Sequence, residues 1–278
     1  MRATRRHPVV RLGADGSRRR RSDTLAGEEP LEVRVGGMSL SVTMRTPGDD
    51  VDLALGFLLS EGVLRSPDQV ATVGYGPGVE ADGTRSYNVV EVTLAAGVPA
   101  PDLSLERRVY TSSSCGICGT SSIEAVRKTT RYDVADDDLR VPLAEVLSLP
   151  DRLRERQGVF DRTGGVHAAA LFRVEDDGPA ELLCVREDVG RHNAVDKVLG
   201  WALRTDLLPA RRCVLQLSGR ASFELVQKAQ MAGVPVLAAV SAPSALAVDL
   251  AAEAGMTLMG FSRGDSVNVY TGGDRVVG

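Results

Sequence analysis

The amino-acid sequence predicts an α/β protein in two parts, and three observations lead to this fold class. In the C-terminal half, short apolar strand candidates alternate with helix candidates, which is typical of a parallel sheet with right-handed crossovers. Near the N-terminus, a hairpin pattern followed by an amphipathic helix indicates a smaller α+β unit. The chain has 278 residues, 43% hydrophobic but only 4% aromatic, so we expect a core built mainly from Ala, Val and Leu.

Residues 1–27 form a basic segment, which we expect to be a disordered arm. Residues 1–22 contain eight Arg and one acidic residue, Asp15, so they carry +7, and the net charge of −4 leaves −11 for the remainder. No apolar stretch follows Thr4-Arg5-Arg6, which argues against an export signal. No apolar run approaches the roughly 20 residues of a membrane helix. We therefore expect a cytoplasmic protein that binds neither membrane nor nucleic acid.

Residues 28–102 are predicted to form the small α+β domain. Apolar residues alternate on both sides of Gly36-Gly37, a pattern typical of a hairpin. Asp50 and Asp52 lie in the first turn of the next apolar stretch, where the helix dipole favours acidic side chains. The expected elements are a hairpin over 30–44, a helix over 49–63 and a strand over 88–94, followed by a linker over 95–101.

Residues 103–278 are predicted to form the larger domain. Ser121 and Glu124 have the spacing of a capping box, so a helix is expected to start there. Further along, apolar strand candidates and helix candidates alternate. The expected strands cover 107–110, 167–174, 181–186, 213–217, 234–240 and 256–261, and the expected helices cover 121–130, 143–157, 193–204, 222–232 and 243–254.

The ends of the last three predicted strands carry residues suited to a phosphorylated ligand. In such sheets, ligands bind beyond the carboxyl ends of the strands. The segments there are Ser218-Gly-Arg220, Ser241-Ala-Pro-Ser244 and Phe261-Ser-Arg-Gly264. Arg pairs with phosphate, Gly permits close approach of the backbone, Ser supplies hydroxyls, and the Phe ring offers a face on which a base stacks. We therefore predict a ligand pocket at these loops.

Cys115 and Cys118 stand in the run Ser112-Ser-Ser-Cys-Gly-Ile-Cys-Gly119. Two thiols at this spacing can bind a metal, exchange a disulfide or carry sulfur as a persulfide. A zinc site normally needs a second ligand pair, which the sequence does not require, and both thiols precede the predicted helix start, unlike a thioredoxin-type site. The residues alone leave all three chemistries open. Cys184 and Cys213 lie in apolar strand candidates and are predicted to be core residues.

Nine stretches of the sequence strongly resemble the FdhD family, the formate dehydrogenase accessory sulfurtransferases. They occur in the family's order from about residue 28 to the end, and the arginine-rich arm falls outside them. The matching stretches are 45–49, 55–62, 112–119, 163–169, 186–197, 217–224, 231–243, 260–264 and 268–270.

The resemblance implies a function, a fold and an assembly. Members of the family accept sulfur from an L-cysteine desulfurase and transfer it to the bis-molybdopterin guanine dinucleotide form of the molybdenum cofactor, on which formate dehydrogenase depends. By this resemblance the protein is a sulfurtransferase, its larger domain is similar in fold to cytidine deaminase, and it forms a homodimer. A two-fold dimer would suit a cofactor with two similar arms.

The resemblance also implies which residues act. Cys115 should carry the persulfide, with Cys118 assisting. The family's cofactor-binding stretch maps onto the predicted pocket, where Arg220 and Arg263 are candidates for phosphate binding and Phe261 for stacking. The complete set expected to bind the cofactor is Ser218, Arg220, Phe261, Ser262, Arg263, Gly264, Asp265 and Ser266; we expect no side chain to bind a metal ion of its own.

Two alternatives and one cluster stay open. The protein is either the sulfurtransferase or a non-catalytic chaperone that binds the molybdenum cofactor for formate dehydrogenase, and a zinc-stabilised binding module is a further alternative. A charged cluster at a strand-to-helix junction could line a sulfur channel or cap the helix. Its members are His167, Glu187, Asp188, Arg191 and His192.

Overall fold

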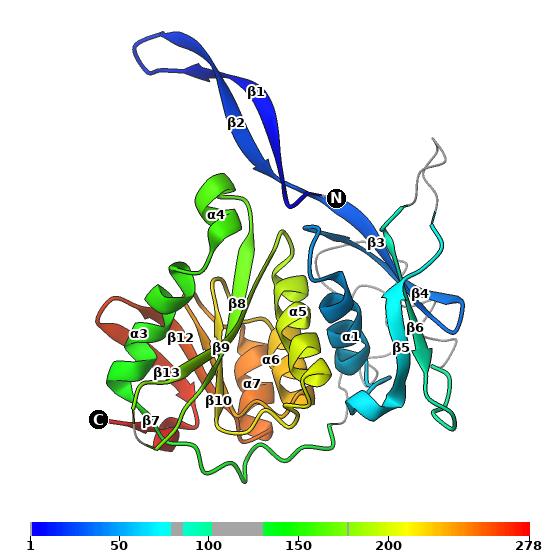
Figure 1. Cartoon of the computed structure of the whole chain (residues 1–278). Coiled ribbons are helices and arrows are strands. Elements are labelled where there is room, and N and C mark those ends of the chain that lie inside the picture. Colours follow the sequence, from blue (N-terminus) through cyan, green and yellow to red (C-terminus); the bar gives the residue numbers. More distant parts are fainter. Residues whose placement is uncertain (1, 79–85, 102–129, 177) are drawn as a thin grey trace.

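A computed structural model describes residues 2–78, 86–101, 130–176 and 178–278 of the chain. The described elements form a six-stranded sheet, a four-stranded sheet, and helices between and around them (Figure 1). This arrangement confirms the predicted α/β class, while a fold like that of cytidine deaminase stays a prediction. The longest helix among the described residues has 14 residues. No helix in this part of the chain is long and apolar enough to cross a membrane.

The basic N-terminal segment forms a β-hairpin, so the prediction of a disordered arm was wrong. Strands β1 (Thr4–Leu12) and β2 (Arg18–Ala26) pair antiparallel along their whole length, and the hairpin projects from the body (Figure 1). Consecutive arginines are compatible with a strand because successive side chains point to opposite faces. Gly16, at φ +80°, lies in the turn, a conformation that glycine adopts without strain.

The small sheet follows the hairpin directly and confirms the three elements predicted there. Leu31, Val33 and Val35 alternate with more exposed residues and point into the core. A further strand of this sheet, β5 (Val70–Tyr75), was not predicted because its short apolar pattern is interrupted at Gly74. The elements are β3 (Glu29–Val35), β4 (Met38–Arg45), helix α1 (Asp50–Ser60), η1 (Pro67–Gln69), β5 (Val70–Tyr75) and β6 (Val89–Leu94), with strand order β4-β3-β6-β5.

The six-stranded sheet has the order β13-β12-β11-β10-β8-β9. Its neighbours β10, β11 and β12 are parallel as predicted, whereas β8, β9 and β13 run antiparallel to their neighbours. The parallel arrangement predicted from the three alternating apolar strands at the end of the chain is therefore confirmed, and the sheet is extended by antiparallel strands, some of them joined by short connections such as the turn at Gly264. The strands are β8 (His167–Arg173), β9 (Glu181–Asp188), β10 (Cys213–Leu217), β11 (Val236–Ala239), β12 (Thr257–Arg263) and β13 (Ser266–Thr271).

Helices cover both faces of this sheet. The apolar residues of one face, such as Phe172, pack with α3, and those of the other face pack with α5, α6 and α7. The four long helices predicted for this part are confirmed; the strand expected over 107–110 and most of the helix expected over 121–130 lie outside the described residues. The remaining elements are β7 (Val141–Pro142), α3 (Leu143–Arg154), α4 (Gly158–Thr163), α5 (Arg191–Arg204), α6 (Phe223–Met231), α7 (Ala245–Glu253), η3 (Gly273–Arg275) and β14 (Val276–Val277).

Helix α1 joins the two sheets, since it lies between the four-stranded sheet and α5 (Figure 1). The backbones of α1 and α5 approach so closely that a Cβ on Gly56 would lie 1.8 Å from the carbonyl oxygen of Asp196. A Cβ on Gly200 would lie 1.8 Å from the carbonyl oxygen of Asp52. One continuous core therefore includes both parts of the chain, while the predicted boundary at residue 102 falls outside the described residues.

Candidate functional site

The three loops predicted to bind a ligand meet at one edge of the six-stranded sheet. We call residues 218–222, 240–244 and 261–266 the site edge. They lie together because β10, β11 and β12 are parallel neighbours, whose carboxyl ends share one edge. Ala221 and Pro243 form a β-bridge, the Ser244 amide donates to the Ala221 carbonyl at 3.0 Å, and the Phe261 amide donates to the Ser241 carbonyl at 3.3 Å.

The third loop contains a β-bulge that reorients its side chains. Between the pairs Gly260–Asn268 and Arg263–Ser266, two residues of β12 oppose one residue of β13. Phe261 has a φ of +52°, a strained backbone conformation for a bulky residue. Residues with such backbone strain cluster at functional sites. The Arg263 guanidinium carbon lies 5.9 Å from the centre of the Phe261 ring. The bulge thus presents an aromatic ring and a cation side by side.

The predicted cofactor residues differ in accessibility. Ser262 is fully buried, and its hydroxyl has no hydrogen-bond partner within the described part of the chain. The Ser218 hydroxyl accepts a hydrogen bond from the Ala168 amide at 2.8 Å, so it already ties β10 to β8. Phe261 is half-buried. The exposed members of the set are Arg220, Arg263, Gly264, Asp265 and Ser266.

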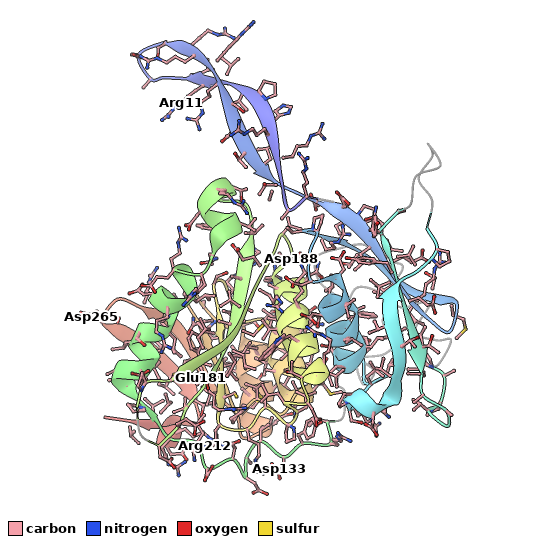
Figure 2. The ribbon with its side chains drawn as sticks, viewed as in Figure 1. Arg11, Asp133, Glu181, Asp188, Arg212 and Asp265 are labelled. Atoms are coloured by element: carbon pink, nitrogen blue, oxygen red, sulfur yellow. The ribbon has the colours of Figure 1, made fainter. Side chains whose placement is uncertain are left out.

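The charged cluster left open by the sequence lies next to the site edge. Because β8 runs antiparallel to β10 and β9 antiparallel to β8, His167 and Asp188 pair at this end of the sheet. Figure 2 shows Asp188 at the end where α4 and the hairpin also lie. A Cβ on Gly219 would lie 3.4 Å from the Nδ1 atom of His167, so the first site loop contacts this histidine. Sequence order alone did not reveal this proximity.

His192 connects the start of α5 to the start of α6. Its Nε2 atom lies 2.9 Å from Oε2 of Glu224, and the Ser222 hydroxyl donates to the same carboxylate at 3.2 Å. Burial raises the pKa of Glu224, but the hydrogen bonds from His192 and Ser222 outweigh it, and the pKa lies below its usual value. Glu224, which we expected from its position on the predicted helix to be solvated, is therefore a half-buried partner of the cluster.

Asp188 has a structural role at the start of α5. Its carboxylate is fully buried and lies 2.7 Å from the Lys197 ammonium. It also accepts hydrogen bonds from the Gly190 amide at 2.8 Å, the Thr46 amide at 3.0 Å and the Asn193 side chain at 3.0 Å. These bonds fix the loop after β4 against the residue that precedes α5 and against the Asn193 side chain in its first turn, so the role of Asp188 is structural.

Glu187 is also engaged away from the site edge. Its two carboxylate oxygens accept hydrogen bonds from the amides of Val159 and Phe160, both at 2.8 Å, at the start of α4. Lys197, with its ammonium on Asp188 and on the Thr46 carbonyl at 2.8 Å, was missed by the sequence reasoning. The sequence did contain a signal for this buried lysine, because it lies four residues after Asn193, on the inner face of a helix.

Arg191, at the start of α5, adds a positive charge at this end of the sheet. The Nε atom of Arg191 is buried and lacks a hydrogen-bond partner among the described residues. Burial lowers the pKa of His167, and the positive charge of Arg191 lowers it further. With Arg220 and Arg263 on the adjacent loops, the local charge favours an anionic ligand.

The four cysteines divide into two groups. Cys184 and Cys213 are buried, as predicted, and burial raises the pKa of each thiol to about 12. Cys115 and Cys118, predicted to be catalytic, lie outside the described residues. Within residues 2–78, 86–101, 130–176 and 178–278, no three His, Cys, Asp or Glu side chains are placed to hold a metal ion.

Comparison with known proteins gives consistent matches over nearly the whole chain. A sequence model of the FdhD/NarQ family matches residues 26–277. The chain is 60% identical to the sulfur carrier protein FdhD of Streptomyces coelicolor, over 99% of this chain and 96% of that protein. It is 56% identical to the protein of the same name from Mycobacterium tuberculosis, over 92% of each chain.

One solved structure has the same fold. A candidate formate dehydrogenase accessory protein from Desulfotalea psychrophila superposes with a TM-score of 0.73 at 23% sequence identity. The match covers 99% of this chain and 100% of that chain, and therefore includes the N-terminal hairpin region.

Proposed function

Because the chain belongs to the FdhD/NarQ family, we propose that it is a sulfur carrier in the maturation of formate dehydrogenase. The observation that supports the sulfur-carrying role most strongly is the 60% identity with a sulfur carrier protein over 99% of the chain. The link to formate dehydrogenase and the two-fold dimer rest on the family resemblance of the sequence motifs.

The finer part of the proposal concerns the chemistry of Cys115. Its thiolate attacks the outer sulfur of a persulfide on an L-cysteine desulfurase, which forms a Cys115 persulfide and releases the thiolate of the desulfurase. Cys118 assists this exchange or the onward transfer. No oxidant is consumed, because the sulfur passes from one thiolate to another at the same oxidation level. The protein therefore acts as a sulfurtransferase.

The site edge is proposed to bind the acceptor of the sulfur, the bis-molybdopterin guanine dinucleotide form of the molybdenum cofactor, as a substrate. Arg220 and Arg263 are exposed on adjacent loops and suit its phosphates. The Phe261 ring, beside Arg263, suits stacking against a guanine base. Arg191 adds positive charge at the same end of the sheet. Ser262 is buried and is not proposed as a direct contact.

Transfer of labelled sulfur tests the catalytic proposal. After incubation with a desulfurase and sulfur-labelled cysteine, mass spectrometry of the wild-type chain should show one added sulfur on Cys115. The Cys115→Ser variant should carry no transferable label and should leave formate dehydrogenase inactive in cells. Cys184→Ser is the matched control, because that thiol is buried. An active Cys115→Ser variant would favour the cofactor-binding chaperone instead.

Nucleotide binding tests the site edge separately. Guanosine diphosphate serves as the probe, and calorimetry measures its Kd. Arg220→Ala and Arg263→Ala should each weaken binding about 10-fold, the loss of one charge-assisted contact of roughly 1.4 kcal/mol. Arg140→Ala, an exposed arginine far from the site loops in sequence, is the control. Unchanged affinity in both site variants would place the ligand elsewhere.

A further inference from the structure

Glu224 places a negative charge beside a site edge that is otherwise suited to an anionic ligand. It lies in the first turn of α6, two residues after Ser222, the last residue of the first site loop. Burial raises the pKa of this carboxyl group, but the hydrogen bonds from His192 and Ser222 outweigh burial and hold the pKa below its ordinary value of 4.5. The side chain is therefore an ionised carboxylate at neutral pH.

The two carboxylate oxygens of Glu224 have different surroundings. Oε2 lies 2.9 Å from Nε2 of His192 and accepts a hydrogen bond from the Ser222 hydroxyl at 3.2 Å. Within the described part of the chain Oε1 has no hydrogen-bond partner, and it is open to solvent on a side chain that is 14% exposed. Glu224 therefore keeps one accessible acceptor oxygen, while the other oxygen holds the carboxylate in place.

Ser222 supplies a second acceptor next to this carboxylate. It occupies the N-cap position of α6, where a serine normally accepts a hydrogen bond from a backbone amide of the first turn, yet its side chain caps no amide there. Its hydroxyl proton is donated to Glu224, so the lone pairs of the hydroxyl oxygen remain available as acceptors. Ser222 thus belongs to the side-chain cluster rather than to the helix cap.

His192 fixes the orientation of the pair. It extends from the first turn of α5, and its ring is 15% exposed. The neighbouring positive charge of Arg191 also helps to lower the pKa of Glu224. His192 is therefore a positioning residue, because it acts on a ligand through the carboxylate that it holds.

This cluster suits a ligand group that donates hydrogen bonds. An ionised carboxylate accepts hydrogen bonds but cannot donate them, and its charge repels phosphate. In a nucleotide site, the partner of Glu224 is therefore the base rather than the phosphates. Guanine presents two neighbouring donors on its Watson–Crick edge, the N1–H group and the 2-amino group, whereas adenine presents an acceptor nitrogen beside its amino group.

We propose that Glu224, with Ser222 beside it, recognises guanine at the site edge by accepting hydrogen bonds from the N1–H and 2-amino groups. This inference rests on the proposed function, because it takes a nucleotide arm of the cofactor as the ligand. Arg220 and Arg263 pair with the phosphates of any nucleotide, and Phe261 stacks on any base, so these three residues do not select guanine. The carboxylate supplies the selectivity that they lack.

The nucleotide preference of the chain tests this inference. Calorimetry measures the Kd of guanosine diphosphate, of inosine diphosphate, which lacks the 2-amino group, and of adenosine diphosphate. The wild-type chain should prefer the guanosine compound over the adenosine compound roughly 10- to 100-fold, with the inosine compound between them, since hydrogen bonds to a charged group are worth this factor. Glu224→Gln keeps the size of the side chain and should lose most of this preference, with little change in the affinity for adenosine diphosphate.

Two further variants test the assigned roles. Ser222→Ala removes no helix cap and should reduce the preference in part. His192→Gln should reduce it as well, and the double variant with Glu224→Gln should lose no more than Glu224→Gln alone, because one residue acts through the other. Thermal unfolding shows that each variant is folded. Glu181→Gln, which removes an exposed carboxylate at the far end of β9, is the matched control and should keep the wild-type preference.

The results separate this inference from the proposed function. A wild-type chain that binds the three diphosphates equally well would overturn the inference, and so would a Glu224→Gln variant that weakens all three by the same factor, as a merely structural role predicts. If Arg220→Ala and Arg263→Ala weaken binding while Glu224→Gln keeps the guanine preference, only the inference fails. If none of the three nucleotides binds, the proposed ligand of the site edge fails with it.

Discussion

Asp188 and Lys197 illustrate how single residues support the site without contacting a ligand. Both side chains are almost completely buried, and their charged atoms lie 2.7 Å apart. A buried ion pair contributes little by itself, but removing one partner leaves an uncompensated charge in the interior. The pair holds the first turn of α5, from which Arg191 and His192 extend. The pair therefore affects function by holding Arg191 and His192 in place.

Asp188→Asn should destabilise the protein by about 3–5 kcal/mol, because the Lys197 ammonium would stay buried without a counter-charge. Urea unfolding followed by circular dichroism measures this free energy. The double variant Asp188→Leu/Lys197→Met should recover much of the loss, since no charge is then buried. Glu181→Gln, at an exposed position of the same strand, is the control. An Asp188→Asn variant as stable as the wild type would contradict the role assigned to the pair.

His167 should make stability depend on pH. Burial and the charge of Arg191 hold its pKa below the ordinary value of 6.5, so the folded state binds a proton less readily than the unfolded state. The stability due to neutral His167 is present above 6.5 and is lost as the pH falls toward the lower folded value. His167→Gln should flatten the decline in unfolding free energy below pH 6.5; His7→Gln, at an exposed position of the hairpin, is the matched control. Parallel declines in both variants would refute this.

The two buried thiols should resist alkylation. With pKa values raised to about 12, Cys184 and Cys213 hold roughly one thiolate per ten thousand at about pH 8. A Cys115→Ser/Cys118→Ser variant should therefore take up no iodoacetamide in the native state and two equivalents in urea, as counted by mass spectrometry. Rapid labelling of the native variant would show that one of these strands opens readily.

At the scale of elements, the contact between α1 and α5 decides how the small sheet is attached. Gly56 on α1 and Gly200 on α5 let the two backbones touch, and the buried hydroxyl of Ser60 donates to Asp196 at 2.8 Å across the same interface. The hydrophobic pattern predicted both helices. It did not predict which helices pair, because that choice depends on the absence of a side chain at two positions.

Gly56→Ala should cost about 3 kcal/mol of stability, since the added methyl group would overlap the Asp196 carbonyl and force the helices apart. Gly200→Ala should have a similar effect. Gly74→Ala on β5 is the matched control, because no atom lies within 4 Å of the added Cβ there. Thermal unfolding of the three variants compares them directly. Equal melting temperatures for Gly56→Ala and Gly74→Ala would mean that the helices are not in close contact.

Three of the strands missed by sequence reasoning share one physical cause. Strands β1, β2 and β13 show exposure on both sides, so they lack the alternation of apolar and polar residues that identifies a half-buried strand. These strands form because their backbone pairs with the backbone of a neighbouring strand. The buried strands β10, β11 and β12 were predicted within two residues at each end, because their apolar runs are bounded by Gly, Pro and Ser.

At the scale of the whole molecule, one core extends from the small sheet to the six-stranded sheet. Leu31 and Val33 of the small sheet belong to the same cluster of buried residues as Leu237 and Leu258. The sequence predicted the three site loops correctly as neighbours, since a parallel strand order places their ends together. It did not place His167 beside them, because that proximity depends on β8 running antiparallel, which the apolar pattern does not encode.

The shared core predicts a single unfolding transition. Fluorescence of Trp201 on α5 and far-ultraviolet circular dichroism of the whole chain should give the same midpoint in urea. A two-domain protein with a boundary near residue 102 would instead allow the small sheet to melt separately. Two resolved transitions, or a folded fragment of residues 28–102, would show that the parts are independent.

The pairing of Ser60 with Asp196, 136 residues later in the chain, also constrains biosynthesis. At the usual translation speed of about 5–20 residues per second, α1 leaves the ribosome roughly 7–27 seconds before its partner helix exists. During that interval the side of α1 that packs on α5 has no surface to cover it. A nascent chain of this kind is a natural client of ribosome-associated chaperones.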